Sequence, residues 1–334
     1  MMTNTGAIVA AAMFLFPVAT LQAAEPWPVL TGDIGIHDPS AIFVDGSYVA
    51  FGTGAAPFGR GAIRIKTSPD GIAWTDAGFI GEGVPAWVRP AIGVQPSELW
   101  APTISRLGER FFLYYSASRF GVNTSAIGLA INDHFDPLHP ADGWEDQGLV
   151  VATTATDDFN AIDPSRVDTP DGRAWLAFGS FWSGIKMREL DPVGGKLKAG
   201  AETLHSLASR GRGAIEAPSL LRHSDYYYLF VSFDRCCAGV ASTYRIIVGR
   251  SDAVIGPFVD REGRPLLAAG GTQLAATTGR FIGPGGQEVF TTPAGDLIVF
   301  HYYDGDGAGI PKLAMTTIRW TIDGWPEFDI PNSD

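Results

Sequence analysis

Three carboxylates recur in nearly the same sequence setting at widely separated points of the chain. Asp38 lies in "HDPS", Asp163 in "IDPS" and Glu216 in "IEAPS", so a proline followed by serine comes shortly after each acid. Asp-Pro often starts a turn, and turn capping is therefore the alternative role for a single copy. Acids within strands of Ile, Ala, Phe and Val are costly to bury without a purpose. Three of them in one register favour a shared site.

Two or more carboxylates that face one groove, with aromatic rings nearby, suit glycoside hydrolysis. One carboxylic acid protonates the leaving oxygen, another carboxylate activates water, and aromatic rings stack on the sugar faces. The candidate rings are Trp100, Phe120, Phe181 and Trp182. Taken alone, each ring belongs more often to a core than to a sugar platform, but Phe181 and Trp182 follow an apolar strand, where a loop should begin. No spacing of Cys and His residues suits a zinc site.

The elements that must position these acids are repeated along the chain. Five stretches combine a turn residue with an aromatic-rich apolar strand. They recur at intervals of about 60 residues and begin at Gly46, Gly108, Gly172, Asp225 and Gly295. Four of them are preceded by a proline that Ser or Thr follows, namely Pro39, Pro102, Pro164 and Pro218. Proline cannot donate to a strand ladder, so it needs an edge. The innermost strand of a propeller blade is such an edge.

Units of this length with several short strands fit the blades of a β-propeller. We therefore predict an all-β fold, a five-bladed β-propeller over residues 25–334. Each blade should begin with a short strand carrying x-Pro-Ser/Thr and continue through a hairpin turn. The fifth unit is the least regular, because "GPGG" at 283–286 stands where the others have x-Pro-Ser/Thr. Two stacked β-sandwiches would not explain the even spacing. Inner strands surround a channel, so the three acids should meet at one mouth of it.

Composition narrows the class of protein. Of the 334 residues, 46% are hydrophobic and 18% are charged, which is typical of a globular protein. The net charge is −12, without basic blocks, which argues against nucleic acid and anionic membranes as partners. A neutral glycan is compatible with this charge. We expect a monomer.

The N-terminus predicts export. An apolar run from Ala7 to Ala19 is followed by the small residues Ala23 and Ala24, although no Lys or Arg precedes the run. Residues 1–24 are therefore interpreted as a cleaved signal peptide, with an uncleaved anchor as the alternative. The mature protein would be secreted, to the periplasm or the medium.

Cys236 and Cys237 are the only cysteines and are adjacent, so they cannot link distant parts of the fold. Adjacent cysteines can form a vicinal disulfide, but two buried thiols are the favoured interpretation.

Together these motifs resemble the endo-α-1,5-L-arabinanases of glycoside hydrolase family 43, which are five-bladed propellers. The likeness runs from about His37 to Pro326 and includes "HDPS" at 37–40, "LWAP" at 99–102, "NAIDPS" at 160–165, "WLAFGSFWSGIKM" at 175–187 and "IEAPSL" at 215–220. The resemblance implies an inverting, endo-acting enzyme whose partners are arabinan and arabino-oligosaccharides. An exo-acting relative, or an arabinan-binding propeller without catalysis, is the alternative.

The resemblance also assigns roles. Asp38 corresponds to the general base, Glu216 to the general acid, and Asp163 to the residue that orients Glu216 and raises its pKa. The residues implied as sugar contacts are Asn160, Ala161, Ile162, Ser180, Phe181 and Trp182.

One departure concerns an ion. The family usually has Gly-Pro-Gly-His in the fifth blade, and that His helps to hold an ion, commonly calcium, near the site. Here the position is Gly286, while His301 lies in the next strand, as a ligand or as a core residue. We therefore expect no required cofactor and leave calcium open.

Overall fold

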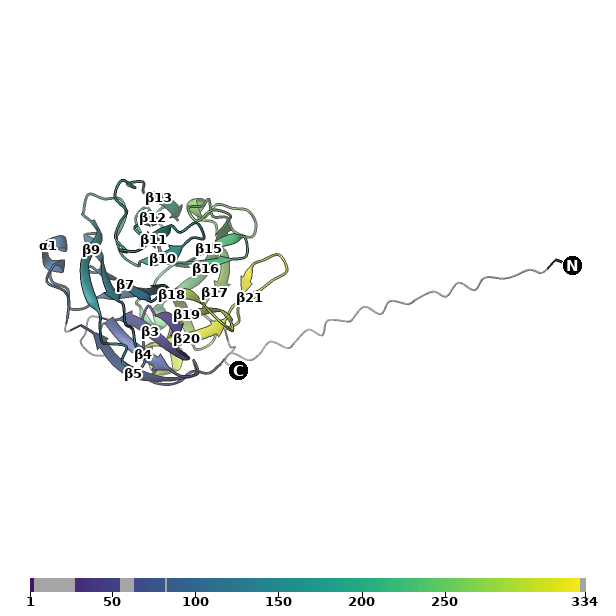
Figure 1. The fold of residues 1–334 in the computed structure, drawn as a ribbon, viewed down its shortest axis with the longest axis horizontal. Coiled ribbons are helices and arrows are strands. Elements are labelled where there is room, and N and C mark those ends of the chain that lie inside the picture. The colour runs from purple at the N-terminus through teal and green to yellow at the C-terminus, as the bar shows by residue number, and fades with distance from the viewer. Residues whose placement is uncertain (3–27, 55–62, 82, 331–334) are drawn as a thin grey trace.

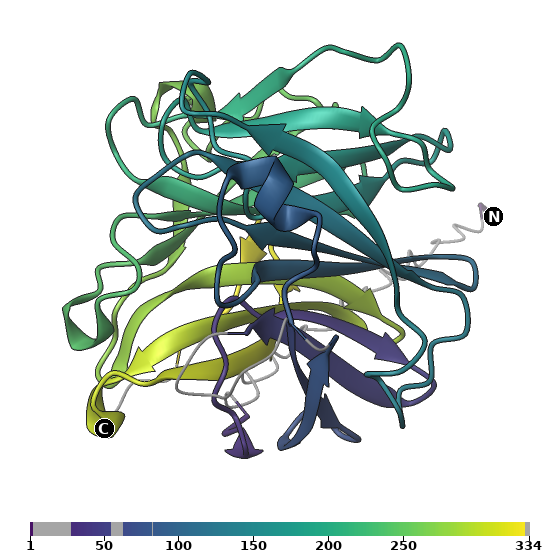
Figure 2. The ribbon, with the colours of Figure 1, turned by 90° about the vertical axis from the view of Figure 1, so that its left-hand side faces the viewer.

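The computed structural model describes residues 1–2, 28–54, 63–81 and 83–330. Apart from its first two residues, the predicted signal peptide lies outside this described part. Among the described residues, none of the helices combines the length and apolar character needed to cross a membrane. The described chain folds into five main β-sheets set around one axis (Figure 1, Figure 2).

The five sheets follow one another along the chain, as propeller blades do. The first blade contains β1 (Thr31–Gly32), β2 (Ser40–Val44), β3 (Ser47–Thr53), β4 (Ile63–Ser68) and β5 (Ala73–Ile80). The second contains β6 (Trp100–Leu107), β7 (Arg110–Ala117), β8 (Ser125–Asn132) and β9 (Glu145–Thr153). The third contains β10 (Ser165–Asp168), β11 (Ala174–Phe178), β12 (Ile185–Leu190) and β13 (His205–Ala208).

The last two blades complete the circle. The fourth contains β14 (Ile215–His223), β15 (Tyr226–Phe233), β16 (Arg245–Ser251) and β17 (Thr272–Ala275), and the fifth contains β18 (Phe281–Thr292), β19 (Gly295–Asp304) and β20 (Pro311–Thr317). A small sheet of β21 (Arg319–Trp320) and β22 (Pro326–Glu327) follows. The described helical segments are short: α1 (Val88–Ile92), η1 (Gly239–Ala241), η2 (Leu266–Ala268) and η3 (Gly305–Gly307). The predicted all-β, five-bladed propeller is confirmed.

Each blade starts with the predicted antiparallel hairpin. The paired strands are β2 with β3, β6 with β7, β10 with β11, β14 with β15 and β18 with β19. The second strand of each hairpin is an aromatic-rich stretch whose side chains pack against neighbouring blades. Phe51 of β3, for example, shares a buried cluster with Leu113 and Tyr115 of β7. Burial of this apolar surface between sheets holds the blades together.

Five residues with left-handed backbone, here called the inner ring, mark equivalent points on the innermost strands or just before them. They are Asp38, Ala101, Asp163, Ala217 and Gly286, with φ angles of 46°, 38°, 56°, 52° and 58°. Residues other than glycine rarely adopt this conformation, because the Cβ atom crowds the backbone. The left-handed conformation is maintained here by hydrogen bonds to the backbone N–H group of each residue.

A hydrogen bond from the previous blade binds the backbone N–H of every inner-ring residue. The pairs are Ala101 N to Thr53 Oγ1 (2.9 Å), Asp163 N to Ser116 Oγ (2.9 Å), Ala217 N to Asp163 Oδ2 (3.0 Å), Gly286 N to Ser232 Oγ (3.0 Å) and Asp38 N to His301 Nδ1 (3.1 Å). These five bonds link all five blades in a closed circle. Two of the candidate acids, Asp38 and Asp163, are therefore placed by the same structural rule.

The prolines lie where the strand ladder does not need their N–H. Pro39 and Pro164 come just before β2 and β10, and Pro102 and Pro218 fall in register shifts of their hairpins. The prediction that "GPGG" takes the place of x-Pro-Ser/Thr in the fifth blade is wrong, because its proline lies too early in the sequence. Gly286 is the inner-ring residue there, so Gln287 and Glu288 occupy the places of proline and of Ser/Thr.

The first and last blades are joined directly. The Ile36 N–H donates to the Pro311 carbonyl oxygen at 3.3 Å, and the Leu313 N–H donates to the Ile34 carbonyl oxygen at 2.7 Å. These backbone bonds connect the segment that leads into β2 with β20. The chain segment that carries Asp38 is therefore fixed by hydrogen bonds to a strand near the other end of the sequence.

Candidate active site

Asp38, Asp163 and Glu216 lie near one another at the central channel. Asp38 and Asp163 line a cavity of about 20 Å³, enough for about one water molecule, together with a further acid, Glu288. Glu216 lies on β14, directly before the inner-ring residue Ala217. It is close enough to Asp163 to act on the pKa of that carboxyl group. Blades one, three and four thus each contribute one acid.

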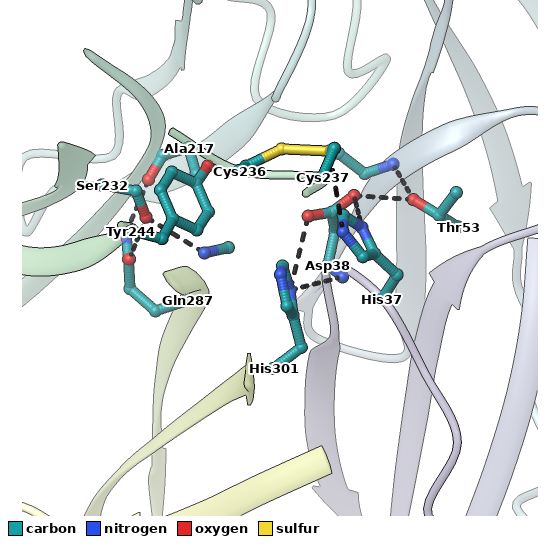
Figure 3. A network of polar contacts seen from close by, with 12 residues as sticks. His37, Asp38, Thr53, Ala217, Ser232, Cys236, Cys237, Tyr244, Gln287 and His301 are labelled. Carbon is teal, nitrogen blue, oxygen red and sulfur yellow. Dashed lines mark hydrogen bonds and ion pairs between the residues drawn. A yellow bond between two sulfur atoms is a disulfide. The ribbon is translucent and has the colours of Figure 1, made fainter. Parts of the chain in front are cut away.

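Asp38 is held as an ionised carboxylate. Its Oδ2 atom accepts a hydrogen bond from Thr53 Oγ1 at 2.8 Å and lies 2.7 Å from His37 Nδ1 (Figure 3). Burial alone would raise the pKa of Asp38, but His37, His301 and Thr53 outweigh it and lower that pKa to about 2. The side chain keeps 21% of its surface exposed, so water can reach it. An ionised, accessible carboxylate can take a proton from water.

Glu216 has the opposite environment. Its Oε2 atom accepts a hydrogen bond from Ser180 Oγ at 2.7 Å, and its Oε1 atom accepts one from the Tyr244 hydroxyl at 2.6 Å. Burial raises the pKa of Glu216 and the charge of Asp38 adds to the rise, while the two hydroxyl donors act in the opposite direction. A carboxyl group that keeps its proton towards neutral pH can serve as a general acid.

Asp163 links the two ends of this arrangement. Its Oδ2 atom accepts a hydrogen bond from the Ala217 N–H, next to Glu216, while its own N–H donates to Ser116 Oγ. Burial raises the pKa of Asp163 well above its usual value, and the charges of Glu216 and Asp38 raise it further. Asp163 and Glu216 therefore disfavour each other's ionised form, so that the pair retains a proton more readily than two separate acids would.

The predicted stacking rings lie at different depths. Phe181 and Trp182 have exposed fractions of 43% and 39%, in the loop after β11, and both have left-handed backbone. The Phe181 N–H donates to the Ile215 carbonyl oxygen, which ties this loop to the strand carrying Glu216. Phe120 has an exposed fraction of 80%, and Trp100 is half-buried on β6. Exposed rings on loops are available to a sugar.

The other predicted sugar contacts are buried. Asn160 and Ile162 have exposed fractions of 3% and 8%, and Ser180 directs its hydroxyl to Glu216. The side chain of Ala161 is completely buried in a core cluster, where its methyl group packs against the second and third blades.

Sequence reasoning missed several groups around the acids. His37 and Thr53 bind Asp38, Tyr244 binds Glu216, and Tyr303 binds His37. His37 was visible as the residue next to Asp38 in "HDPS". The two tyrosines carried no usable signal, because their partners lie on other strands and, for Tyr303, in another blade.

The expectation of two buried thiols is also wrong. Cys236 and Cys237 form a disulfide in the turn after β15, where Cys236 is half-buried and Cys237 is exposed. The turn lies beside the site, with Cys237 Sγ 3.9 Å from His37 Nε2 (Figure 3).

The groups around Asp38 do not suit a calcium ion. Ligand atoms of His37, Asp38 and His301 lie within 4.8 Å of one another, but they offer two imidazoles and one carboxylate. Calcium prefers six to eight oxygen ligands. His301 Nδ1 already accepts the Asp38 N–H, and a Cβ atom at Gly286 would lie 2.6 Å from Asp38 Oδ1 and 2.8 Å from the His301 ring. His301 thus fills the space beside Gly286.

Comparisons with known proteins agree with this geometry. A family model described as glycosyl hydrolases family 43 matches residues 26–326. The chain is 42% identical over 295 residues to the extracellular endo-α-(1→5)-L-arabinanase 1 of Bacillus subtilis strain 168, which covers 88% of this chain and 87% of that protein. It is 36% identical over 310 residues to the extracellular exo-α-(1→5)-L-arabinofuranosidase ArbA of Cellvibrio japonicus, covering 89% and 87%.

The fold is shared as well. A solved endo-arabinanase from Bacillus licheniformis superimposes with a TM-score of 0.82 and 42% sequence identity, covering 90% of this chain and 99% of that one. Both the sequence match and the structural match extend through all five blades. The chain therefore belongs to family 43 of the glycosyl hydrolases.

Proposed function

We propose that this protein hydrolyses α-1,5-L-arabinofuranosidic bonds inside arabinan, with inversion at the anomeric carbon. The observation that carries the proposal is the contrast between two carboxyl groups: Asp38 is bound by His37 and Thr53 and stays partly exposed, whereas Glu216 is buried and bound by two hydroxyl groups. These surroundings lower the pKa of Asp38 and raise that of Glu216. An inverting glycosidase needs this division between an ionised base and a protonated acid. The names of the related proteins support arabinan as the substrate.

In this reaction Glu216 gives its proton to the glycosidic oxygen as the bond between that oxygen and the anomeric carbon breaks. Water attacks the anomeric carbon from the opposite face, and Asp38 takes a proton from that water. Each cleavage consumes one water molecule and leaves the new hydroxyl in the inverted configuration. Asp163 holds the backbone next to Glu216, and the two carboxyl groups interact electrostatically, so Asp163 positions and tunes the acid.

Release of reducing ends from debranched arabinan tests the activity, and the anomer first formed, followed by proton NMR, tests inversion. If the folded wild-type protein releases no sugar from arabinan, the proposal fails. Binding of arabinan by calorimetry without turnover would then favour the alternative, an arabinan-binding propeller without catalysis.

Exo action is the second candidate, because one of the two relatives described above is an exo-arabinofuranosidase and the other is an endo-arabinanase. The product profile on linear arabinan separates the two modes. Mixed oligosaccharides early in the reaction support endo action, and a single early product supports exo action.

We further propose that the protein works as a secreted monomer without a bound metal ion. The names of both relatives support secretion, and the donor set beside Asp38 supports independence from calcium. Sequencing the N-terminus of protein recovered from the medium or periplasm tests signal removal, and sedimentation tests the monomer.

A further inference from the structure

The Tyr303 hydroxyl joins the disulfide turn to the base Asp38. It lies 2.7 Å from the Cys237 backbone nitrogen, 2.9 Å from His37 Nε2 and 3.3 Å from His301 Nε2. Tyr303 itself has an exposed fraction of only 3%, so these protein groups replace water around its oxygen. The hydroxyl is thus a junction between three segments that are far apart in sequence.

The positions of the protons in this network follow from its donors. The Asp38 N–H can only be accepted by an unprotonated His301 Nδ1, so the His301 proton is on Nε2 and points towards Tyr303. The Tyr303 oxygen then accepts from His301 and from the Cys237 N–H, which uses both of its acceptor sites. Its own proton is then directed to His37 Nε2 at 2.9 Å, with Ser242 as a further neighbour of the hydroxyl.

His37 is consequently held with its proton on Nδ1, facing Asp38 Oδ2 at 2.7 Å. A second proton on Nε2 would meet the Tyr303 oxygen, which already accepts two donors. Burial also disfavours the charged ring, although the charge of Asp38 raises the pKa of His37 overall. In either charge state the Nδ1–H is the atom that holds the carboxylate.

We propose that the Cys236–Cys237 turn is a positioning element of the active site, which acts through Tyr303 and His37 to orient the base Asp38. The Cys237 N–H anchors the Tyr303 hydroxyl, the hydroxyl fixes the ring of His37, and the ring fixes Oδ2 of Asp38. The proposal rests on the proposed function only in taking Asp38 as the base.

The backbone of the turn explains why a bond between adjacent cysteines is useful here. Cys237 has a φ angle of 58°, a left-handed conformation that a residue with a Cβ atom avoids when it is free. In this conformation its N–H faces Tyr303. The covalent link to Cys236 restricts the backbone, so the N–H stays in place although the Cys237 side chain is exposed. The base of the turn is fixed separately, by the Ala238 N–H on Ser242 Oγ.

The test combines Tyr303→Phe with the double variant Cys236→Ser/Cys237→Ser, alone and together. Tyr114→Phe is the matched control, because the Tyr114 hydroxyl is also buried but donates to the Gly195 carbonyl oxygen, away from the acids. Wild-type protein treated with a phosphine reductant gives a further arm, since these are the only two cysteines in the chain.

Two measurements are made on each protein. Nitrogen-15 NMR of histidine-labelled protein, with His37→Gln used for assignment, reports the tautomer of His37 whether or not sugar is cleaved. Steady-state kinetics on arabinan separates kcat from KM. We expect Tyr303→Phe and loss of the disulfide to move the His37 signals away from their wild-type positions and to lower kcat about tenfold, with KM nearly unchanged.

Because all the changes act on one chain of contacts, the combined variant should lose no more activity than Tyr303→Phe alone. The proposal is wrong if loss of the disulfide lowers the melting temperature but leaves kcat and the His37 signals as in the wild type. It is also wrong if the losses multiply in the combined variant. If the wild type does not cleave arabinan, the proposed function fails, and the NMR measurement still decides whether the turn orients His37.

Discussion

At the scale of residues, Asp38 and Asp163 show how far surroundings can separate two copies of one side chain. Both precede a proline, and both have left-handed backbone in the inner ring. Asp38 faces His37 and Thr53, which stabilise its charge, whereas Asp163 faces other carboxylates, which destabilise its own. The difference in pKa therefore comes from the partners of each carboxyl group, which are His37 and Thr53 of the first blade for Asp38 and acids of other blades for Asp163.

The first prediction concerns the acid. Glu216→Gln should lower kcat on arabinan about 10²- to 10⁴-fold, because the leaving alkoxide would depart without a proton. Activity should recover largely on an aryl arabinofuranoside with an acidic phenol, which needs no protonation. Glu145→Gln, at an exposed position, is the control and should behave as the wild type. An equal loss of activity on both substrates would contradict the role of Glu216.

The second prediction concerns Tyr244. Its hydroxyl donates to Glu216 Oε1 and so lowers the pKa of that carboxyl group. Tyr244→Phe should raise the pKa of Glu216 and move the alkaline limb of the kcat/KM profile to higher pH, since the acid must be protonated to act. Tyr228→Phe, whose hydroxyl donates to the Gly324 carbonyl oxygen, should leave the profile unchanged. A shift to lower pH would show that the hydrogen bond acts in the other direction.

The sequence could reveal the three acids because they sit in repeated motifs, where register alone brings them together. It could not reveal Tyr244, Tyr303 or Ser180 as their partners. Those contacts depend on the path of each loop between strands, and no spacing in the sequence encodes that path. Nor does the motif that contains Ala161 reveal that the side chain of this residue points into the core.

At the scale of elements, the inner ring replaces direct strand pairing between blades. The described innermost strands belong to separate sheets, so the five hydrogen bonds to inner-ring N–H groups fix how one blade sits against the next. A second set of hydrogen bonds between blades supports the ring, and it involves serines that lie two residues after inner-ring residues. Ser40, Ser165 and Ser219 accept the N–H groups of Ile104, Leu220 and Val289 from the next blade.

The third prediction tests how much stability this ring provides. Ser232→Ala leaves the buried Gly286 N–H and the Gln287 side-chain oxygen without their shared partner, which costs about 1–3 kcal/mol. The midpoint of chemical unfolding should fall accordingly. Ser97→Ala, at an exposed serine whose hydroxyl bonds to the adjacent Glu98, should change it little. Equal midpoints for the two variants would show that the ring bond contributes no stability.

Hairpins and aromatic strands were predictable because turn residues and apolar runs recur with a regular period. The register of the fifth blade was not, since Gln287 stands where the other inner strands have proline. The nearby "GPGG" contains the expected proline but lies a few residues too early. The prediction relied on the proline of the motif, whereas the equivalent position in the fold is defined by the left-handed backbone of Gly286.

At the scale of the whole molecule, one acid inside the channel is unexplained by the mechanism. Glu288 replaces the Ser or Thr of the other inner strands, and the Thr103 hydroxyl donates to both of its carboxyl oxygens at 3.0 and 2.9 Å. Burial raises the pKa of Glu288 to about 8, against the lowering effect of Thr103 and Ser40. The folded protein therefore binds this proton more tightly than the unfolded chain does.

The fourth prediction follows from that difference. A raised folded-state pKa gives stability that is complete below the unfolded value, near 4.5, and is lost as pH rises towards 8. Glu288→Gln removes this loss, so its melting temperature relative to the wild type should rise by a few degrees between pH 5 and pH 8. Glu202→Gln, at an exposed position, should follow the wild type at each pH. Parallel curves for Glu288→Gln and wild type would contradict a buried, proton-retaining Glu288.

The fifth prediction concerns metal. Treatment with a chelator, followed by added calcium, should change neither arabinan cleavage nor the melting temperature, because His301 and Asp38 fill the space beside Gly286. Colorimetric release of reducing ends and differential scanning calorimetry measure the two quantities. Loss of activity that calcium restores would show that an ion binds elsewhere in the site.

The closure of the first blade on the last has a consequence for the order in which the site is completed during synthesis. Every side chain that contacts Asp163 or Glu216 by a hydrogen bond described above comes from residues 116 to 244, so this pair is finished while the ribosome still has blade five to make. Asp38 is translated first of the three acids but must wait for His301 and Tyr303. A chain that stops short of β19 would therefore contain the hydrogen-bond partners of Asp163 and Glu216 described above, but it would lack the His301 and Tyr303 that hold the surroundings of Asp38.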